Sequence, residues 1–363
     1  MDWGFFQELL SIDSTSGKEW KVAEWLAERL PGMFPAANRP ELRAEEVGDG
    51  TLNLLLAWGT PRIVFCSHLD TVPPYIPPTF PERWPVAAGH DENTAVIPGL
   101  TGNLPETIKG RGSCDAKGQV FAIIEACKQL AEEGKTDFGM LLLSGEETGS
   151  WGAKAFAKTK FRAEYLVVGE PTDNCMVSAS KGTKSFDLKF TGEPFHSGYP
   201  KYGVSAVDLF VEFVNALKAK DFGMDPVLGE TTWNIGLLHS DNPQNILSPE
   251  LTCRLYFRTT FVSDEAVCQW MAEASSVIPG LTGNLAVTAR GGDTPARYWI
   301  VEGLPSKSVA FGSDAPHLKN FTHKAICGPG SITVAHRDDE CVRVADLATA
   351  VEQYLALYRS VTE

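Results

Sequence analysis

Short, uninterrupted apolar runs alternate with helix-like apolar stripes along the first half of the chain. The solid runs, which are typical of strands buried on both faces of a sheet, fall at residues 52–58, 63–67, 140–143 and 165–168. Helical spacing of apolar residues predicts helices over 18–30, with Ser16 as the N-cap, and over 117–133. This alternation predicts an α/β domain: a mixed sheet flanked by helices.

The pattern changes at about residue 183 to the order β-α-β-β-α-β. We expect strands over 185–191, 232–238, 251–260 and 285–289, and helices over 204–218 and 264–278, the second capped by Ser263. That order is typical of a ferredoxin-like α+β domain. The sequence therefore predicts a discontinuous catalytic domain (1–182 and 291–363) with a small domain inserted at 183–290. A last helix is expected over 345–358.

Residues 73–109 read differently, because six prolines between Pro73 and Pro85 are followed by a polar stretch. We expect a long surface loop or flap there. The nine-residue segment at 96–104 is repeated at 277–285, and the sequence offers no physical reason for this repeat.

Composition narrows the class of protein. Hydrophobic residues make up 43% and charged residues 21% of the 363 residues, as in ordinary globular proteins, and no run of 18 apolar residues is present. The formal net charge of -14 argues against a nucleic-acid partner. The N-terminus lacks a signal-peptide pattern, and the eight cysteines include no Cys-x-x-Cys pair. We expect a cytoplasmic protein with reduced cysteines, no membrane partner and no nucleic-acid partner.

Acidic residues and histidines stand where predicted strands end. His68 follows one strand, Glu146-Glu147 and Glu170 follow two others, and Asp115 precedes the helix over 117–133. Each alone is unspecific, since a surface histidine, an N-cap aspartate or an acidic loop would look the same. Their order is more informative, because open α/β sheets build their sites at these strand ends.

A late histidine, His336, completes a set that suits metal ions. Two imidazoles and three carboxylates are what two neighbouring zinc-like ions need when one carboxylate bridges them. Asp70, beside His68, and Glu146, beside Glu147, remain for supporting and base roles. The residues therefore predict a two-metal hydrolase.

Five stretches carry a resemblance to a known family. They are residues 67–73, 110–118, 146–147 and 169–172 and the segment around His336. The chain resembles the family of acetylornithine deacetylase, succinyl-diaminopimelate desuccinylase, aminoacylase and glutamate carboxypeptidase. The predicted β-α-β-β-α-β insertion is similar to the lid or dimerisation domain of that family.

The resemblance implies roles for the ligand residues. His68 and Glu170 would bind one Zn²⁺, Glu147 and His336 would bind the other, and Asp115 would bridge them, with Co²⁺ as a possible substitute. It also implies a cis peptide bond after Asp115.

Two further acids receive roles from the same resemblance. Asp70 would orient His68. Glu146 would be the general base that takes a proton from the attacking water and passes it to the leaving amine.

Residues of the inserted domain and of one late loop receive substrate-facing roles. His196 would stabilise the oxyanion, and Asn245 and Arg258 would hold the substrate's α-carboxylate. Ser313 lies in Gly312-Ser313-Asp314-Ala315, which resembles a loop beside the family's site. The family's dimerisation through this domain implies a homodimer.

Several functions stay open on the sequence. The first choice is removal of the acyl group from an N-acyl amino acid, most like acetylornithine deacetylase in arginine biosynthesis. Succinyl-diaminopimelate desuccinylase, a dipeptidase or a carboxypeptidase are alternatives within the class. Outside it stands a catalytically inactive relative that only binds its ligand.

Overall fold

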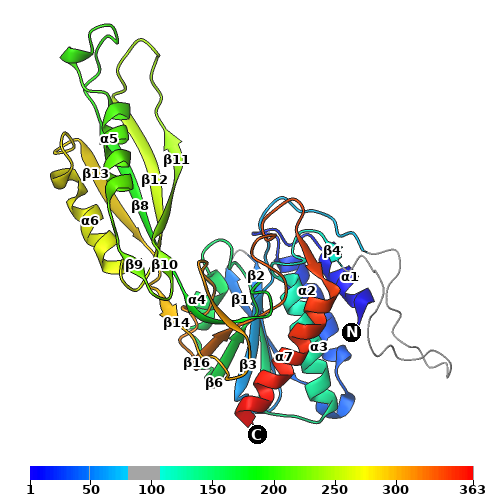
Figure 1. Cartoon of the computed structure of the whole chain (residues 1–363). Helices are drawn as coiled ribbons and strands as arrows, with labels where there is room; N and C mark the ends of the chain where they lie inside the picture. The colour runs from blue at the N-terminus through cyan, green and yellow to red at the C-terminus, as the bar shows by residue number, and fades with distance from the viewer. Residues whose placement is uncertain (49, 81–106, 363) are drawn as a thin grey trace. The chain divides into compact units, whose positions relative to one another are not determined.

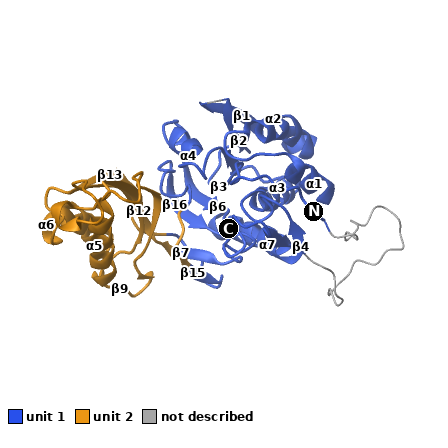
Figure 2. Ribbon diagram, turned by 90° about the horizontal axis from the view of Figure 1, so that it is seen from above, with its two compact units in different colours: residues 1–178, 298–307, 313–363 blue, residues 179–297, 308–312 orange. Residues whose placement is uncertain are grey.

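The computed structural model describes residues 1–48, 50–80 and 107–362 (Figure 1). They form two compact units, coloured separately in Figure 2. Unit 1 comprises Met1–Ser178, Tyr298–Lys307 and Ser313–Glu363, and unit 2 comprises Ala179–Arg297 and Ser308–Gly312. Unit 2 is thus inserted into the sequence of unit 1.

A six-stranded mixed sheet organises unit 1, with the order β1-β2-β5-β3-β6-β16. Strands β5, β3, β6 and β16 are parallel neighbours, whereas β2 pairs antiparallel with both β5 and β1. The strands are β1 (Glu41–Gly48), β2 (Thr51–Ala57), β3 (Ile63–His68), β5 (Phe138–Leu143), β6 (Ala163–Val168) and β16 (Phe321–Ile326). The predicted mixed sheet of an α/β domain is therefore confirmed.

Helices cover this sheet because its central strands are apolar on both faces. Helices α3 (Lys117–Glu132) and α7 (Val344–Thr362) lie side by side and pack against β3 (Figure 1). Helices α1 (Trp3–Ser11) and α2 (Trp20–Arg29) join the same core, while α4 (Trp151–Phe156) contacts β1 and β2.

Two features at the N-terminus differ from expectation. Ser16 does not cap α2, which begins four residues later with Glu19 at its N-cap, and the Ser16 hydroxyl instead donates to Asp70 (3.1 Å). Helix α1 was not expected. Its N-cap is Asp2, whose carboxylate accepts from the Phe5 amide (3.0 Å).

Unit 2 has the ferredoxin-like order. Its antiparallel sheet runs β11-β12-β8-β13, which is the strand order that a β-α-β-β-α-β chain gives in that fold. The strands are β8 (Gly182–Thr191), β11 (Thr232–His239), β12 (Glu250–Thr259) and β13 (Leu285–Gly291), and the helices are α5 (Ala206–Ala219) and α6 (Asp264–Val277). Ser263 stands at the N-cap of α6, but its hydroxyl accepts from the Thr260 amide (2.9 Å). The inserted α+β domain is confirmed.

Small elements connect the larger ones. They are β4 (Thr107–Lys109) paired with β17 (Cys341–Arg343), β9 (Met224–Asp225) paired with β10 (Gly229–Glu230), the sheet β14 (Ala296–Arg297), β7 (Met176–Ser180) and β15 (Ser306–Val309), and the 3₁₀ turns Leu30–Met33, Ala36–Asn38 and Pro200–Tyr202. Most of the predicted 73–109 loop, and with it the first copy of the repeat, lies outside the described residues. The second copy spans the end of α6 and the start of β13.

Two expectations about the whole chain can be compared with the described residues. All eight cysteines lie among them and are free thiols. Within the same part of the chain, each helix is too short or too polar to cross a lipid bilayer.

The Trp58 side chain is a test of the unit 1 core. It is 1% exposed, stacks on Phe138 (ring centroids 4.3 Å apart), meets Phe34 edge-on (4.8 Å) and donates to the Asn38 carbonyl (3.1 Å). We expect Trp58→Ala to lower the free energy of unfolding of unit 1 by about 3–5 kcal/mol, because a large cavity replaces the indole. Denaturant unfolding followed by circular dichroism measures this. Trp151→Ala, at a side chain 61% exposed, is the control and should change stability by less than about 0.5 kcal/mol.

Candidate metal centre

The parallel strands of unit 1 bring three candidate ligands to one edge of the sheet. His68 is the last residue of β3 and is paired with Leu143, the last residue of β5. Glu147 lies in the turn that follows β5, and Glu170 follows β6, the other neighbour of β3. Because parallel strands end at the same edge, these side chains converge there.

Asp115 approaches the same place from the loop before α3. The peptide bond to Ala116 is cis, as the resemblance implies. Ala116, not Asp115, is the N-cap of α3, so the carboxylate does not serve the helix. Its Oδ1 lies 3.1 Å from His68 Nε2, and its Oδ2 lies 3.3 Å from His336 Nε2. One carboxylate thus presents a different oxygen to each of two imidazoles.

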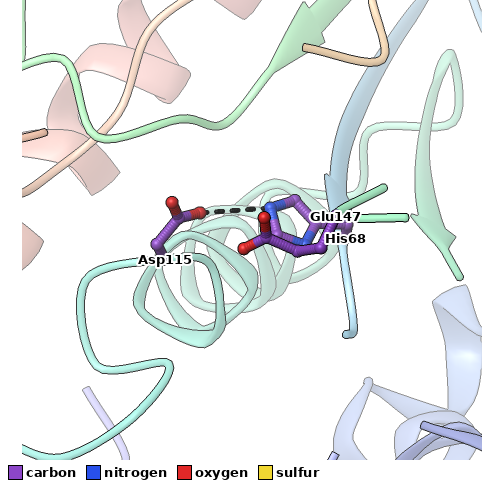
Figure 3. Close-up of side chains that lie close together, drawn as sticks. All are labelled: His68, Asp115 and Glu147. Carbon is purple, nitrogen blue, oxygen red and sulfur yellow. Dashed lines mark hydrogen bonds and ion pairs between the residues drawn. The ribbon is translucent and has the colours of Figure 1, made fainter. Parts of the chain in front are cut away.

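Glu147 and His336 form the second side of the cluster. Their Oε1 and Nε2 atoms are 3.0 Å apart. One ligand atom each from His68, Asp115 and Glu147 lie within 4.8 Å of one another, and Figure 3 shows these three side chains together. His336 adopts a left-handed backbone conformation (φ 64°) and its side chain is 48% exposed. The exposed histidine lies on the solvent side of the cluster.

Glu170 tests whether the cluster fits a metal ion. It is only 4% exposed, and its Oε1 atom is buried without a hydrogen-bond partner among the described residues. Burial, together with the nearby charges of Glu146 and Asp115, raises the pKa of its carboxyl well above the usual range. An unpartnered buried carboxylate oxygen is costly, and a cation is the partner that would remove this cost. Imidazole nitrogens and carboxylate oxygens are the donors zinc accepts, so the residues fit the group.

The two histidines are strongly basic in the absence of a metal. Hydrogen bonds with Asp115 and Glu147 raise the pKa of His336 to about 10. Burial opposes the charged form of His68, but hydrogen bonds to Asp115 and Asp70 raise its pKa well above normal. Burial also opposes ionisation of Asp115, yet its bonds to both imidazoles hold its pKa below the usual range. An imidazole must be neutral to ligate a metal ion, so metal binding at this cluster would release protons and depend on pH.

Asp70 supports more of the site than the sequence suggests. His68 Nδ1 lies 2.9 Å from the Asp70 carbonyl oxygen and 3.4 Å from its carboxylate. The carboxylate accepts from the backbone amides of Glu146 (3.0 Å) and Glu147 (3.1 Å) and from the Ser16 hydroxyl. Asp70 is fully buried. It thus sets the position of the Glu146-Glu147 turn as well as that of His68.

Glu146 lies beside the cluster with an altered acidity. Burial is the main reason that the pKa of its carboxyl is raised well above normal, and the charges of Asp314, Glu147 and Asp115 add to the effect. A carboxylate of raised pKa is a better proton acceptor at neutral pH.

The sequence did not single out three side chains that bear on this site. Glu340 is 1% exposed and pairs with the buried Arg111 guanidinium (Nη1–Oε2 2.6 Å). Burial raises the pKa of Asp314 to about 6, and its Oδ1 has no partner among the described residues. Spacing gave one signal, since Glu340 follows His336 by four residues and Arg111 precedes Asp115 by four. The charged run from Arg337 to Glu340 gave no signal of its own, because such a run is ordinarily a solvated surface.

The substrate-facing candidates lie in different units. Ser313 is buried in unit 1, where its hydroxyl accepts from the Ala315 amide (3.3 Å). His196 and Asn245 lie on neighbouring loops of unit 2, since the Ser197 amide donates to the Asn245 carbonyl (2.9 Å). Arg258 lies on β12, with its guanidinium 5.1 Å from the Tyr256 ring centroid. These three positions belong to unit 2, so the metal cluster is built without them.

The sequence matches a known protein family and several of its members. The model of peptidase family M20/M25/M40 matches residues 64–360. A protein named probable carboxypeptidase from Aspergillus oryzae is 29% identical over 97% of this chain and 86% of its own. Another of that name, from Emericella nidulans, is 31% identical over 98% of this chain and 88% of its own.

Solved structures share the fold. A tripeptidase from Staphylococcus aureus superimposes with a TM-score of 0.78 at 19% identity, over 99% of this chain and 97% of its own. The family match covers the whole candidate cluster from His68 to His336 and the inserted unit 2. The chain therefore belongs to peptidase family M20/M25/M40, a family of metal-dependent hydrolases.

Proposed function

We propose that this protein is a two-metal hydrolase that cleaves the amide bond nearest the free carboxylate of a short peptide or N-acyl amino acid. The observation that carries the proposal is the Asp115 carboxylate, whose two oxygens face two different imidazoles, at 3.1 and 3.3 Å. That arrangement suits a carboxylate shared by two cations. A single-metal site would leave His336 or Glu170 without a role.

The ligand assignment follows the donors. His68 and Glu170 would hold one Zn²⁺, Glu147 and His336 the other, and Asp115 would bridge them. The buried, unpartnered Oε1 of Glu170 and the 3.0 Å contact between Glu147 and His336 support this division. When bound, the ions would polarise the amide carbonyl and lower the pKa of water. Co²⁺ would suit the same nitrogen and oxygen donors.

Glu146 has the properties of the general base. Its raised pKa favours accepting a proton from the attacking water and returning it to the leaving amine. The Asp70 carboxylate holds the Glu146 backbone amide at 3.0 Å, so the base is fixed on the same support as His68. Glu146 and all five ligand residues are present, which favours an enzyme over an inactive binding relative.

The substrate is narrowed by the relatives' names. Two relatives are named probable carboxypeptidases, and the related structure is a tripeptidase. These names favour peptides over N-acetylornithine or N-succinyl-diaminopimelate, which rest on motif resemblance alone. All of these substrates carry a free α-carboxylate, for which an arginine fork such as Arg258, with Asn245 and Ser313, would be suited. His196 would donate to the oxyanion, and a homodimer through unit 2 belongs to the same proposal.

Metal content tests the two-ion site directly. We expect two equivalents of zinc or cobalt per chain by elemental mass spectrometry, because four terminal ligands and one bridging carboxylate match two ions. Chelation should abolish peptide hydrolysis, and zinc or cobalt should restore it. Full activity in the metal-free protein would contradict the proposal.

Replacing Glu146 tests the base. We expect Glu146→Gln to lower kcat by at least about 10²-fold, since the amide cannot accept the water's proton, while both metal equivalents stay bound. The matched control is Glu24→Gln on the exposed face of α2, which should leave kcat unchanged. Near-normal kcat in Glu146→Gln would reject the assignment.

The carboxylate requirement separates the substrate classes. We expect a short peptide with a free C-terminus to be cleaved, and its C-terminal amide to lose at least about 10²-fold in kcat/KM, as a site built for a charged partner rejects the analogue that lacks it. Arg258→Lys should narrow that difference, because lysine lacks the fork. A panel with N-acetylornithine, N-succinyl-diaminopimelate and several di- and tripeptides measures both. Equal cleavage of the free and amidated peptides would refute carboxylate recognition.

A further inference from the structure

A buried ion pair lies behind the candidate metal cluster, on the backbone side of Asp115. The Arg111 and Glu340 side chains are at most 1% exposed, and Nη1 of the first lies 2.6 Å from Oε2 of the second. Burying both charges costs so much desolvation that such a pair contributes little net stability. Its position in unit 1 therefore calls for an explanation other than stability.

The second oxygen of Glu340 holds the loop that carries Asp115. Oε1 accepts from the backbone amides of Gly112 (2.9 Å), Cys114 (3.0 Å) and Asp115 itself (3.0 Å). Successive amides that converge on one anion form a nest. Gly112 makes this possible, because its φ of 84° is one that other residues rarely adopt.

Arg111 holds the segment that carries His336. Its Nη1 donates to the carbonyl of Arg337, the residue after His336 (3.2 Å), and its Nε donates to the carbonyl of Pro74 (3.2 Å). The Gly110 amide donates to the Glu340 carbonyl (3.0 Å), and beyond it β4 pairs with β17. The two segments are thus joined by side-chain contacts, by a backbone hydrogen bond and by strand pairing, although Asp115 and Glu340 are 225 residues apart.

We propose that Arg111 and Glu340, hereafter the clamp, are positioning residues that set the Asp115 carboxylate against His336 for metal binding. The inference rests on the proposed two-metal site. Asp115 reaches both imidazoles at 3.1 and 3.3 Å, so a small displacement of its backbone would change the bridging geometry. The clamp touches the backbone of Asp115 and the carbonyl next to His336, which are the two places where such a displacement would begin.

Metal affinity distinguishes positioning from simple stabilisation. If the clamp only stabilises, disrupting it should lower the unfolding temperature of the metal-free protein and leave the zinc affinity of the folded protein unchanged. If the clamp positions the ligands, disrupting it should weaken zinc binding in protein that is still folded, because loss of the groups that orient metal ligands typically costs about 10–100-fold in affinity.

Two variants and one control form the experiment. Glu340→Gln keeps an oxygen for the three amides but turns an NH₂ group toward Arg111, and Arg111→Lys keeps the charge but loses the fork that reaches Pro74 and Arg337. Tyr358→Phe is the control, because it removes the hydrogen bond that the Tyr358 hydroxyl donates to Asp137 (2.5 Å). Asp137 lies just before the start of β5, at the strand end opposite to the cluster. Zinc dissociation constants are measured by competition with a chromogenic chelator, and thermal unfolding is followed in the metal-free forms.

The clamp predicts zinc binding weakened about 10–100-fold in both folded variants and unchanged in Tyr358→Phe, even where the control unfolds at a lower temperature. If Glu340→Gln does not fold, Arg111→Lys decides alone. Wild-type zinc affinity in the folded variants overturns the clamp while leaving the two-metal site intact. A wild-type protein that binds no zinc overturns the two-metal site itself, and the clamp with it.

Discussion

Repulsion between buried and half-buried carboxylates is the constraint on which the rest of unit 1 depends. Asp115, Glu146, Glu147, Glu170 and Asp314 gather at one edge of one sheet. Two like charges 4 Å apart repel by about 4 kcal/mol at the effective dielectric constant of a protein surface. The raised pKa values of Glu146, Glu170 and Asp314 are the direct result of burial and of this repulsion. Positive charge on the imidazoles, or a bound metal ion, would offset this repulsion.

Hydrogen bonds from backbone amides to two further carboxylates, Asp70 and Glu340, hold the loops that carry these acids. Asp70 accepts from two amides of the Glu146-Glu147 turn, and Glu340 accepts from three amides around Asp115. Each of these inner carboxylates is fully hydrogen-bonded and fixes a loop. The acids of the cluster can then lie close to one another while the loops that carry them stay in place. A rigid inner layer and a polar outer layer are what a preorganised site requires.

Much of this could be predicted from the sequence, because the relevant signals are local. Solid apolar runs located β2, β3, β5 and β6, and the structure brings together His68, Glu147 and Glu170 from the ends of β3, β5 and β6. The ferredoxin-like order of unit 2 followed from its alternating pattern. Ser16 was misjudged because helix capping is a local preference, whereas its actual partner, Asp70, lies 54 residues away. Glu340 was overlooked because a charged run ordinarily faces water, and only a distant arginine and a distant glycine-rich loop bury it.

The insertion of unit 2 has a consequence for the order in which the molecule can be completed during synthesis. Unit 2 is almost contiguous, so its four strands and two helices have all left the ribosome once residue 291 has emerged. Unit 1 must wait for β16, which forms one edge of its sheet, and for α7, which covers β3. Its nascent sheet therefore stands with an apolar face uncovered while more than a hundred residues of unit 2 are translated, and chains in that state are open to aggregation. Helix α7 is thus made after unit 2, yet it covers β3, a strand made before unit 2.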